Sequence, residues 1–169
     1  MNKRAIALFA FAATLTATPA AAEWMFARWG MTPEQLKAAN DAGEGFVPLS
    51  RFAFVTEDPA STADSRILAV AEAGPDETNQ PLRARFGFDS SNRLNRVLVE
   101  PAIAEQCVEL HGQFLGIYGQ PAARNRGEMP DVLRWRRLVG RVDIELRIVG
   151  GLAAPRGCSI DYRTAGALP

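Results

Sequence analysis

The sequence is poor in the residues that most often bind metals or carry out catalysis. It has one histidine, His111, and two cysteines, Cys107 and Cys158. These are too few ligands for a typical structural zinc site, which takes four. The loop carboxylates also lack the spacing of a calcium-binding loop. We therefore expect no metal and no cofactor.

Signature motifs of several enzyme classes are missing as well. The chain has no G-x-S-x-G, Walker, H-E-x-x-H or G-x-G-x-x-G pattern, which argues against common hydrolases, nucleotide-binding proteins and zinc proteases. Histidine-based catalysis would have to use His111 as a general base beside a nucleophile and an orienting acid. The alternative is a histidine at the boundary between the core and the solvent.

Long apolar runs are also absent. The longest, residues 5–18, has about 14 residues, whereas a membrane-spanning helix needs roughly 20, so we expect no membrane span. Lys3 and Arg4 precede this run and small residues follow it at 20–22, a pattern typical of a signal peptide over residues 1–22. The residue directly after the cleavage site is not a cysteine, so we expect no lipid anchor. These features predict a periplasmic or secreted protein.

The rest of the chain, residues 23–169, is long enough for a single domain with a sizeable core. Removing residues 1–22 takes away two of the nineteen cationic residues, which leaves seventeen against nineteen acidic residues and a charge near −2. Nucleic acids and anionic membranes attract a concentrated positive field, which this balance does not supply. We therefore expect no nucleic-acid partner.

The two cysteines predict a disulfide. An even number of cysteines in an exported chain favours a bond over a redox motif, and Cys107 and Cys158 are too far apart for a C-x-x-C site. Closing a loop of about 50 residues would add roughly 4 kcal/mol of stability in the chain-entropy model. Metal binding is the alternative.

The patterns of apolar residues predict an α+β fold, with a mostly antiparallel sheet and two helices packed on it. Each half of residues 23–169 reads as a helix followed by a meander of strands. A capping box begins the first helix at Thr32, and Gly119 with Pro121 ends the second. The expected helices cover 32–40 and 101–118, and the expected strands cover 49–56, 67–73, 83–88, 94–100, 132–139, 141–149 and 157–163.

The same patterns predict which side chains are buried. The continuously apolar run 67–73 is typical of a strand that is central or covered on both faces. In the second helix, the expected buried stripe is Ile103, Cys107, Leu110, Phe114 and Ile117.

Alternation and aromatic content give two further predictions. Along 141–149, the even-numbered residues should face inward, whereas Asp143, Glu145 and Arg147 should face outward. The aromatic stretch from Trp24 to Trp29 is expected to form an opening strand held on the core, although an exposed patch for a partner is the alternative.

The strongest candidate for a binding surface is a cluster of arginines around a tryptophan. Arg134, Trp135, Arg136 and Arg141 flank a predicted hairpin at Gly140. Arginine forks bind carboxylates and phosphates, and tryptophan adds stacking. The alternative is an ordinary outward strand face, on which Asp143 and Glu145 balance the arginine charges. Glu105 and Glu109, on the second helix, are interpreted as solvated surface charges.

Two motifs resemble a group of uncharacterised small exported bacterial proteins. These are the run from Ala27 to Leu36, with its Trp-Gly-Met-Thr-Pro-Glu-Gln helix start, and the later Tyr118-Gly-Gln-Pro121. The group carries no assigned activity. The helix-then-meander layout is also similar to the folds of outer-membrane assembly lipoproteins and β-lactamase inhibitors. The missing lipidation cysteine departs from the former.

Together these observations predict a non-catalytic periplasmic interaction module that binds an envelope protein through the open sheet face or the arginine hairpin. Two alternatives remain open. One is a cell-envelope hydrolase that uses His111, and the other is a carrier that holds a small apolar ligand between helix and sheet.

Overall fold

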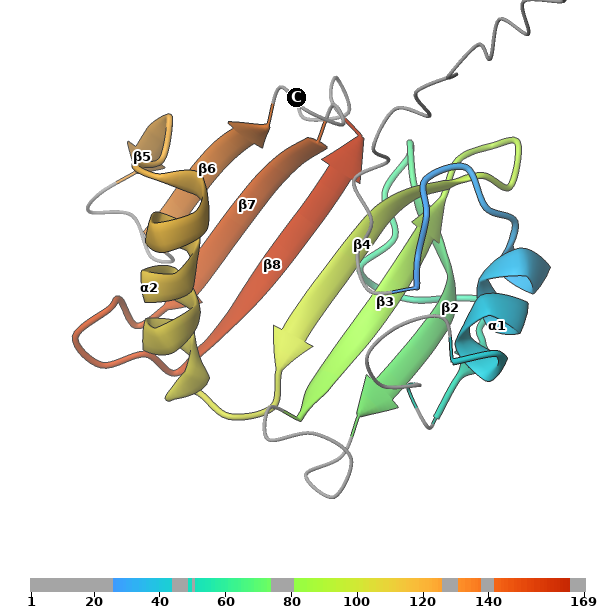
Figure 1. The fold of residues 1–169 in the computed structure, drawn as a ribbon, viewed down its shortest axis with the longest axis horizontal. Helices are drawn as coiled ribbons and strands as arrows, with labels where there is room; N and C mark the ends of the chain where they lie inside the picture. Colours follow the sequence, from blue (N-terminus) through green and yellow to red (C-terminus); the bar gives the residue numbers. More distant parts are fainter. Residues whose placement is uncertain are drawn as a thin grey trace, which may run out of the picture.

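A computed structural model describes residues 26–43, 49, 51–73, 81–125, 131–137 and 142–164. The predicted signal peptide and Trp24 lie outside these residues. Figure 1 shows an α+β fold, which confirms the predicted class. The elements in chain order are α1 (Pro33–Asp41), β1 (Ala53–Phe54), β2 (Arg66–Ala73), β3 (Leu82–Phe88), β4 (Leu94–Pro101), α2 (Gln106–Tyr118), β5 (Ala123–Asn125), β6 (Asp131–Arg137), β7 (Val142–Val149) and β8 (Gly157–Thr164).

All eight strands belong to one antiparallel sheet with the order β1-β2-β3-β4-β8-β7-β6-β5. Each half of the chain contributes a helix followed by antiparallel strands, as predicted, and each half has four strands where three were predicted for the second. The halves meet where β4 pairs with β8. Both helices contribute to a single core cluster, through Leu36 of α1 and through Cys107 and Phe114 of α2. No helix among the described residues is long and apolar enough to cross a membrane.

The predicted capping box begins α1. The Thr32 side chain accepts a hydrogen bond from the Gln35 amide, and the Gln35 side chain accepts one from the Thr32 amide. These two bonds satisfy amides that the first turn leaves without helical partners. The other end of α1 is tied down by Asn40, whose buried side chain bonds both the amide and the carbonyl of Leu49.

The second helix begins later than predicted, and its buried stripe is narrower. Pro101 is the last residue of β4 and does not open the helix. Ile103 therefore precedes the helix, outside its periodicity, and it is exposed. Ile117 is 69% exposed, because Tyr118 supplies the core contact at that end by packing on Phe114.

The termination of α2 and several strands agree with the prediction. Gly119 ends the helix with a φ of 73°. The expected hairpin forms between β3 and β4, and it turns through Asp89 and Asn92. The even-numbered residues of β7 are buried, as expected from their alternation.

The edges of the sheet differ from the prediction. Only Ala53 and Phe54 of the expected strand 49–56 are in a strand, and Phe54 is half exposed. In addition, β5 forms within a segment that was expected to be a loop. The strand β2 lies next to the short β1, near one edge of the sheet, and is therefore not central. It is covered on both faces, because Ala69 faces the main core and Val70 is buried on the other face.

A segment between β1 and β2 covers the same face of the sheet over the neighbouring strands β3 and β4. Asp58 accepts a hydrogen bond from Arg85, and the Ala60 carbonyl accepts one from Arg96. The Ser65 hydroxyl donates to Asn95 at 2.7 Å. Residues 58–65 therefore lie over β3 and β4 on the face opposite the helices.

The segment before α1 is held on the core but does not form the predicted strand. Phe26 is buried and its ring lies 5.9 Å from that of Phe86. Backbone hydrogen bonds join Gly30 and Met31 to Leu94 on β4. This part of the aromatic stretch is therefore packed core and not an exposed patch.

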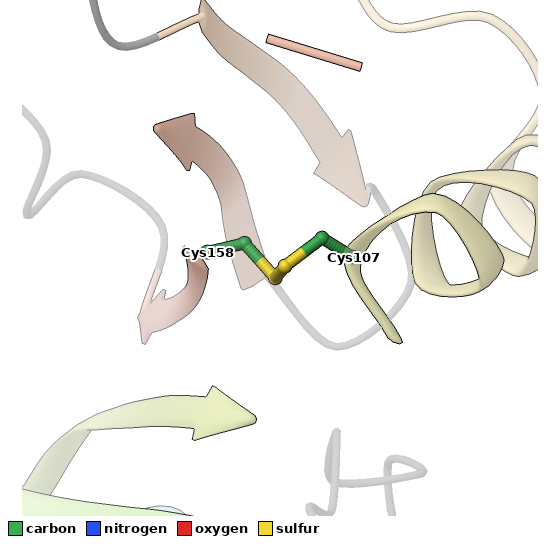
Figure 2. The surroundings of a disulfide bond; sticks show 2 residues. All are labelled: Cys107 and Cys158. Atoms are coloured by element: carbon green, nitrogen blue, oxygen red, sulfur yellow. A yellow bond between two sulfur atoms is a disulfide. The ribbon is translucent and has the colours of Figure 1, made fainter. Parts of the chain in front are cut away.

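The predicted disulfide is confirmed. Cys107, in the first turn of α2, is bonded to Cys158, at the start of β8 (Figure 2). Both side chains are buried. The bond therefore joins the helix to the strand that it covers, across a sequence separation of 51 residues.

Replacing both cysteines with alanine should lower the free energy of unfolding by about 4 kcal/mol, because the unfolded chain regains the freedom of a loop of roughly 50 residues. Urea unfolding of the oxidised protein and of the double variant measures this difference. Reduced wild-type protein is the control and should unfold with the variant. An unchanged unfolding midpoint would contradict the stabilising role.

Gly87→Ala should destabilise the fold by about 1–3 kcal/mol, the usual range for overpacking. A Cβ at this position would lie 2.2 Å from the Ser65 hydroxyl and 3.1 Å from Arg96 Cβ, so the Ser65 side chain, which donates a hydrogen bond to Asn95, would have to move. Gly112→Ala is the matched control, since nothing lies within 4 Å of the added Cβ. Alanine in this helical position should stabilise by about 0.5–1 kcal/mol. Thermal unfolding of both variants tests the pair, and equal shifts would refute the argument.

Candidate functional site

The strands of the second half have one apolar and one charged face. Ile144 and Leu146 of β7 point into the core, and so do their partners Tyr162 and Ile160 on β8. The intervening positions carry charge on the other face, because successive side chains of a strand alternate. We call this side of β6, β7 and β8 the polar face. Its described charged residues are Arg134, Asp143, Glu145, Arg147, Asp161 and Arg163.

The first cluster on this face lies at the junction between the two halves. Arg96 of β4 binds Asp161 of β8 with two hydrogen bonds, of 2.9 Å from Nε and 2.7 Å from Nη2. Arg163 donates a third, of 2.6 Å, to the same carboxylate. Burial by itself raises the pKa of Asp161, but the hydrogen bonds and charges of Arg96 and Arg163 outweigh it and hold the pKa below its usual range. The hydrogen bond to Asp161 in turn raises the pKa of Arg163.

The second cluster surrounds Glu145. Arg134 Nε donates to one carboxylate oxygen at 2.6 Å, and Arg147 Nε donates to the other at 2.5 Å. The Glu145 side chain is only 2% exposed, whereas those of Arg134 and Arg147 are 42% and 49% exposed. The carboxylate therefore lies beneath its two cationic partners.

The burial of Asp143 and Glu145 corrects a prediction. Both were expected to face outward into solvent, yet each residue is only 1% exposed. Alternation assigned their face correctly, but neighbouring side chains cover Glu145, namely those of the arginines at 134 and 147. In the register, Asp143 lies opposite Arg163 of β8. Arg147 is exposed, as predicted.

Trp135 belongs to the core and not to the predicted binding surface. It is 3% exposed, its Nε1 donates to the Gly119 carbonyl, and its ring lies 5.4 Å from that of Phe114. Since it follows Arg134 in a strand, it faces the opposite side of the sheet. It therefore cannot stack on a ligand bound by Arg134.

The other two residues of the predicted cluster are described only in part or not at all. Arg136 pairs with Asp143 in the register between β6 and β7, but its side chain lies outside the described residues. The whole of Arg141 lies outside them as well. Of the four predicted binding residues, Arg134 is thus the one that the structure places on the polar face.

His111 lies half-buried on α2. Burial, with a contribution from the charge of Arg124, lowers its pKa. Its Nε2 is buried without a hydrogen-bond partner, so the described residues supply no acid that would orient it there. Glu109 accepts a hydrogen bond from Gln113, and Glu105 is exposed. No group of three or more potential metal ligands occurs in the described parts of the chain.

A surface depression lies beside α1, away from the polar face. One wall is formed by Gln35, Ala38, Ala39 and Ala42, and the segment before the helix forms the other, together with Arg93. None of its lining residues belongs to a strand. This differs from the space between helix and sheet that the apolar-carrier hypothesis expected.

No known protein-family model, curated protein or solved structure matches this chain. The resemblance to uncharacterised exported proteins therefore stays a prediction, and so does the similarity of the layout to assembly lipoproteins and β-lactamase inhibitors. The charges and the exposure of the polar face are the observations from which a function can be inferred.

Asp161→Asn should destabilise the protein by about 3–5 kcal/mol, because it leaves the buried guanidinium of Arg96 without its counter-charge. Urea unfolding at pH 7 measures this loss. Asp41→Asn is the control, since its exposed pair with Lys37 should be worth less than about 1 kcal/mol.

The same variant should change how stability depends on pH. The folded-state pKa of Asp161 is depressed, so its contribution is fully present above the usual value of 3.8 and is lost as the pH falls through the lower folded-state pKa. Below about pH 4, the free energy of unfolding should therefore fall less steeply with decreasing pH in Asp161→Asn than in the wild type. An identical pH profile in both proteins would contradict this assignment.

Proposed function

We propose that this chain is an exported, non-catalytic binding module whose protein partner docks on the polar face of β6, β7 and β8. The observation that carries the proposal is the exposure of Arg134 and Arg147 above a buried carboxylate. These arginines are structured parts of a sheet, so a partner would meet them in a fixed arrangement.

A comparison between the two halves of the sheet supports this location. In the first half, the segment 58–65 covers the equivalent face, and the side chains of Arg85 and Arg96 are only 13% and 8% exposed. In the second half, the arginine side chains at 134 and 147 are almost half exposed. Among the described arginines on this side of the second half, these two are therefore the most accessible to another molecule, since the Arg163 side chain is only 14% exposed. Arg83, near one end of β3 in the first half, is similarly exposed.

The energetics of buried ion pairs also favour binding over a purely structural role. Removing charges from water is costly, and well-packed apolar residues often stabilise a fold as much or more. A buried carboxylate that binds two exposed guanidinium groups therefore adds little to the free energy of unfolding compared with apolar residues. It suits a surface that has to present oriented cationic groups.

The proposed location of the protein is the periplasm or the extracellular medium. The predicted signal peptide over residues 1–22 supports export, and the Cys107–Cys158 bond is of the kind that persists in oxidising compartments. The partner would then be an envelope or secreted protein.

Photo-crosslinking in cells tests the proposal. A photoreactive phenylalanine analogue at position 132 or 159, the two register partners of Arg147 on the polar face, leaves both arginines in place and should give a discrete adduct of higher mass. The same analogue at Gln113, on the exposed side of α2, should give none. Fractionation of the same cells should return the protein from the periplasm or the medium, without residues 1–22. Adducts equally strong at all three positions, or none at any, would refute docking on the polar face.

A further inference from the structure

Glu145 fixes two guanidinium groups at once. Each of its carboxylate oxygens accepts one hydrogen bond, from Nε of Arg134 on one side and Nε of Arg147 on the other. Glu145 is almost completely buried, so it is anchored in the sheet. The orientation of both arginines is therefore set before any ligand arrives.

The terminal nitrogens of both arginines remain available. Among the described residues, none accepts a hydrogen bond from Nη1 or Nη2 of Arg134 or Arg147, and both side chains are almost half exposed. The paired Nη atoms of a guanidinium form a planar fork that matches the two oxygens of a carboxylate. The polar face thus presents two oriented and unoccupied forks.

We propose that Arg134 and Arg147 form a receptor for two carboxylates of an acidic segment in a protein partner, and that Glu145 is the positioning residue of this receptor. The proposal rests on the proposed function and names the chemistry of its partner. The partner segment lies extended across β6 and β7 and contains two acidic residues separated by one other residue.

The difference in exposure between the carboxylates and the arginines of the polar face favours an acidic partner. The carboxylates of Glu145 and Asp161 are 2% and 5% exposed, whereas the side chains of Arg134 and Arg147, which bind Glu145, are almost half exposed. A molecule that approaches this part of the polar face meets positive charge first, although the described charged residues of the face are three acids and three arginines. Acidic side chains are complementary to that outer layer.

The spacing of the two arginines favours an extended peptide over a single small anion. Arg134 lies opposite Glu145, and Arg147 lies two residues further along β7, so the arginines are diagonal neighbours with Cβ atoms roughly 7–8 Å apart. Side chains two residues apart on an extended strand are about 7 Å apart and share one face. A Glu-x-Glu segment therefore places one carboxylate at each fork.

The overall charge favours a short acidic segment over a long polyanion. The predicted mature chain carries a charge near −2, so it does not attract a polyanion over long distances. Recognition has to come from local contacts at the two forks. A few carboxylates on a protein satisfy this condition, whereas a nucleic acid gains most of its affinity from many phosphate contacts.

Binding of a fluorescein-labelled Ser-Glu-Ser-Glu-Ser peptide to the oxidised protein, measured by fluorescence anisotropy, tests the receptor. The matched peptide with glutamine in place of glutamate should bind at least about tenfold more weakly, since it lacks both charges. Arg134→Lys and Arg147→Lys should each weaken binding of the acidic peptide about tenfold, because lysine keeps the charge but loses the fork. Arg83→Lys, on β3, is the control and should leave binding unchanged.

Glu145→Gln separates positioning from simple charge attraction. The substitution removes a negative charge from beneath the arginines, so electrostatic attraction alone would strengthen binding of the acidic peptide. The positioning role predicts the opposite, a loss of about tenfold or more, because the glutamine amide keeps one acceptor oxygen and turns a donor NH2 group toward the other guanidinium. Should this buried substitution prevent folding, the two exposed lysine variants decide the question.

Several outcomes would overturn the receptor. Among them are equal binding of the glutamate and glutamine peptides, unchanged binding in both lysine variants, and tighter binding by folded Glu145→Gln. Displacement of the acidic peptide by millimolar inorganic phosphate would instead indicate a general anion site. Crosslinks at positions 132 and 159 without preference for the acidic peptide would leave the proposed function intact and refute only the carboxylate receptor. Peptide binding without crosslinks in cells would refute the proposed function.

Discussion

The antiparallel pairing of β4 with β8 is the interaction on which the rest of this structure depends. These are the last strands of the two halves, and their pairing turns two four-stranded units into one sheet. The two hydrogen bonds from Arg96 to Asp161 cross this junction on one face, and contacts in the common core cross it on the other. Without the junction, the core would not be shared between the halves and Arg96 would not reach Asp161.

The core and the proposed binding surface are two sides of the same strands. Trp135, Ile144 and Leu146 complete the core beneath α2, and their neighbours in the sequence carry the charges of the polar face. The Cys107–Cys158 bond fixes α2 on the apolar side, which leaves the other side of β6 to β8 free of a helix. A rigid core thereby keeps Arg134 and Arg147 at fixed positions, as a preorganised binding surface requires.

The two halves share a layout but differ in what covers their polar sides. The segment 58–65 lies on the first half and covers Arg85 and Arg96, whereas Arg134 and Arg147 of the second half reach solvent. The buried carboxylates have opposite consequences in the two places. Asp161 neutralises cationic side chains inside the junction, while Glu145 supports side chains that point outward. Hydrogen bonds between a buried carboxylate and arginines thus stabilise the junction at Asp161, and at Glu145 they orient the arginines for the proposed ligand.

The sequence by itself determined the features that depend on neighbours along the chain: the capping box at Thr32, the end of α2 at Gly119, the hairpin between β3 and β4, and the alternation along β7. The even number of cysteines in a chain with a predicted signal peptide also predicted the disulfide. Only the tertiary structure decided which face was covered and by what. Periodicity gives the direction of a side chain, but burial depends on distant segments that come to lie over it. For this reason Glu145 is buried beneath two arginines, Trp135 lies under α2, and the expected strand around Phe54 shrinks to a two-residue edge.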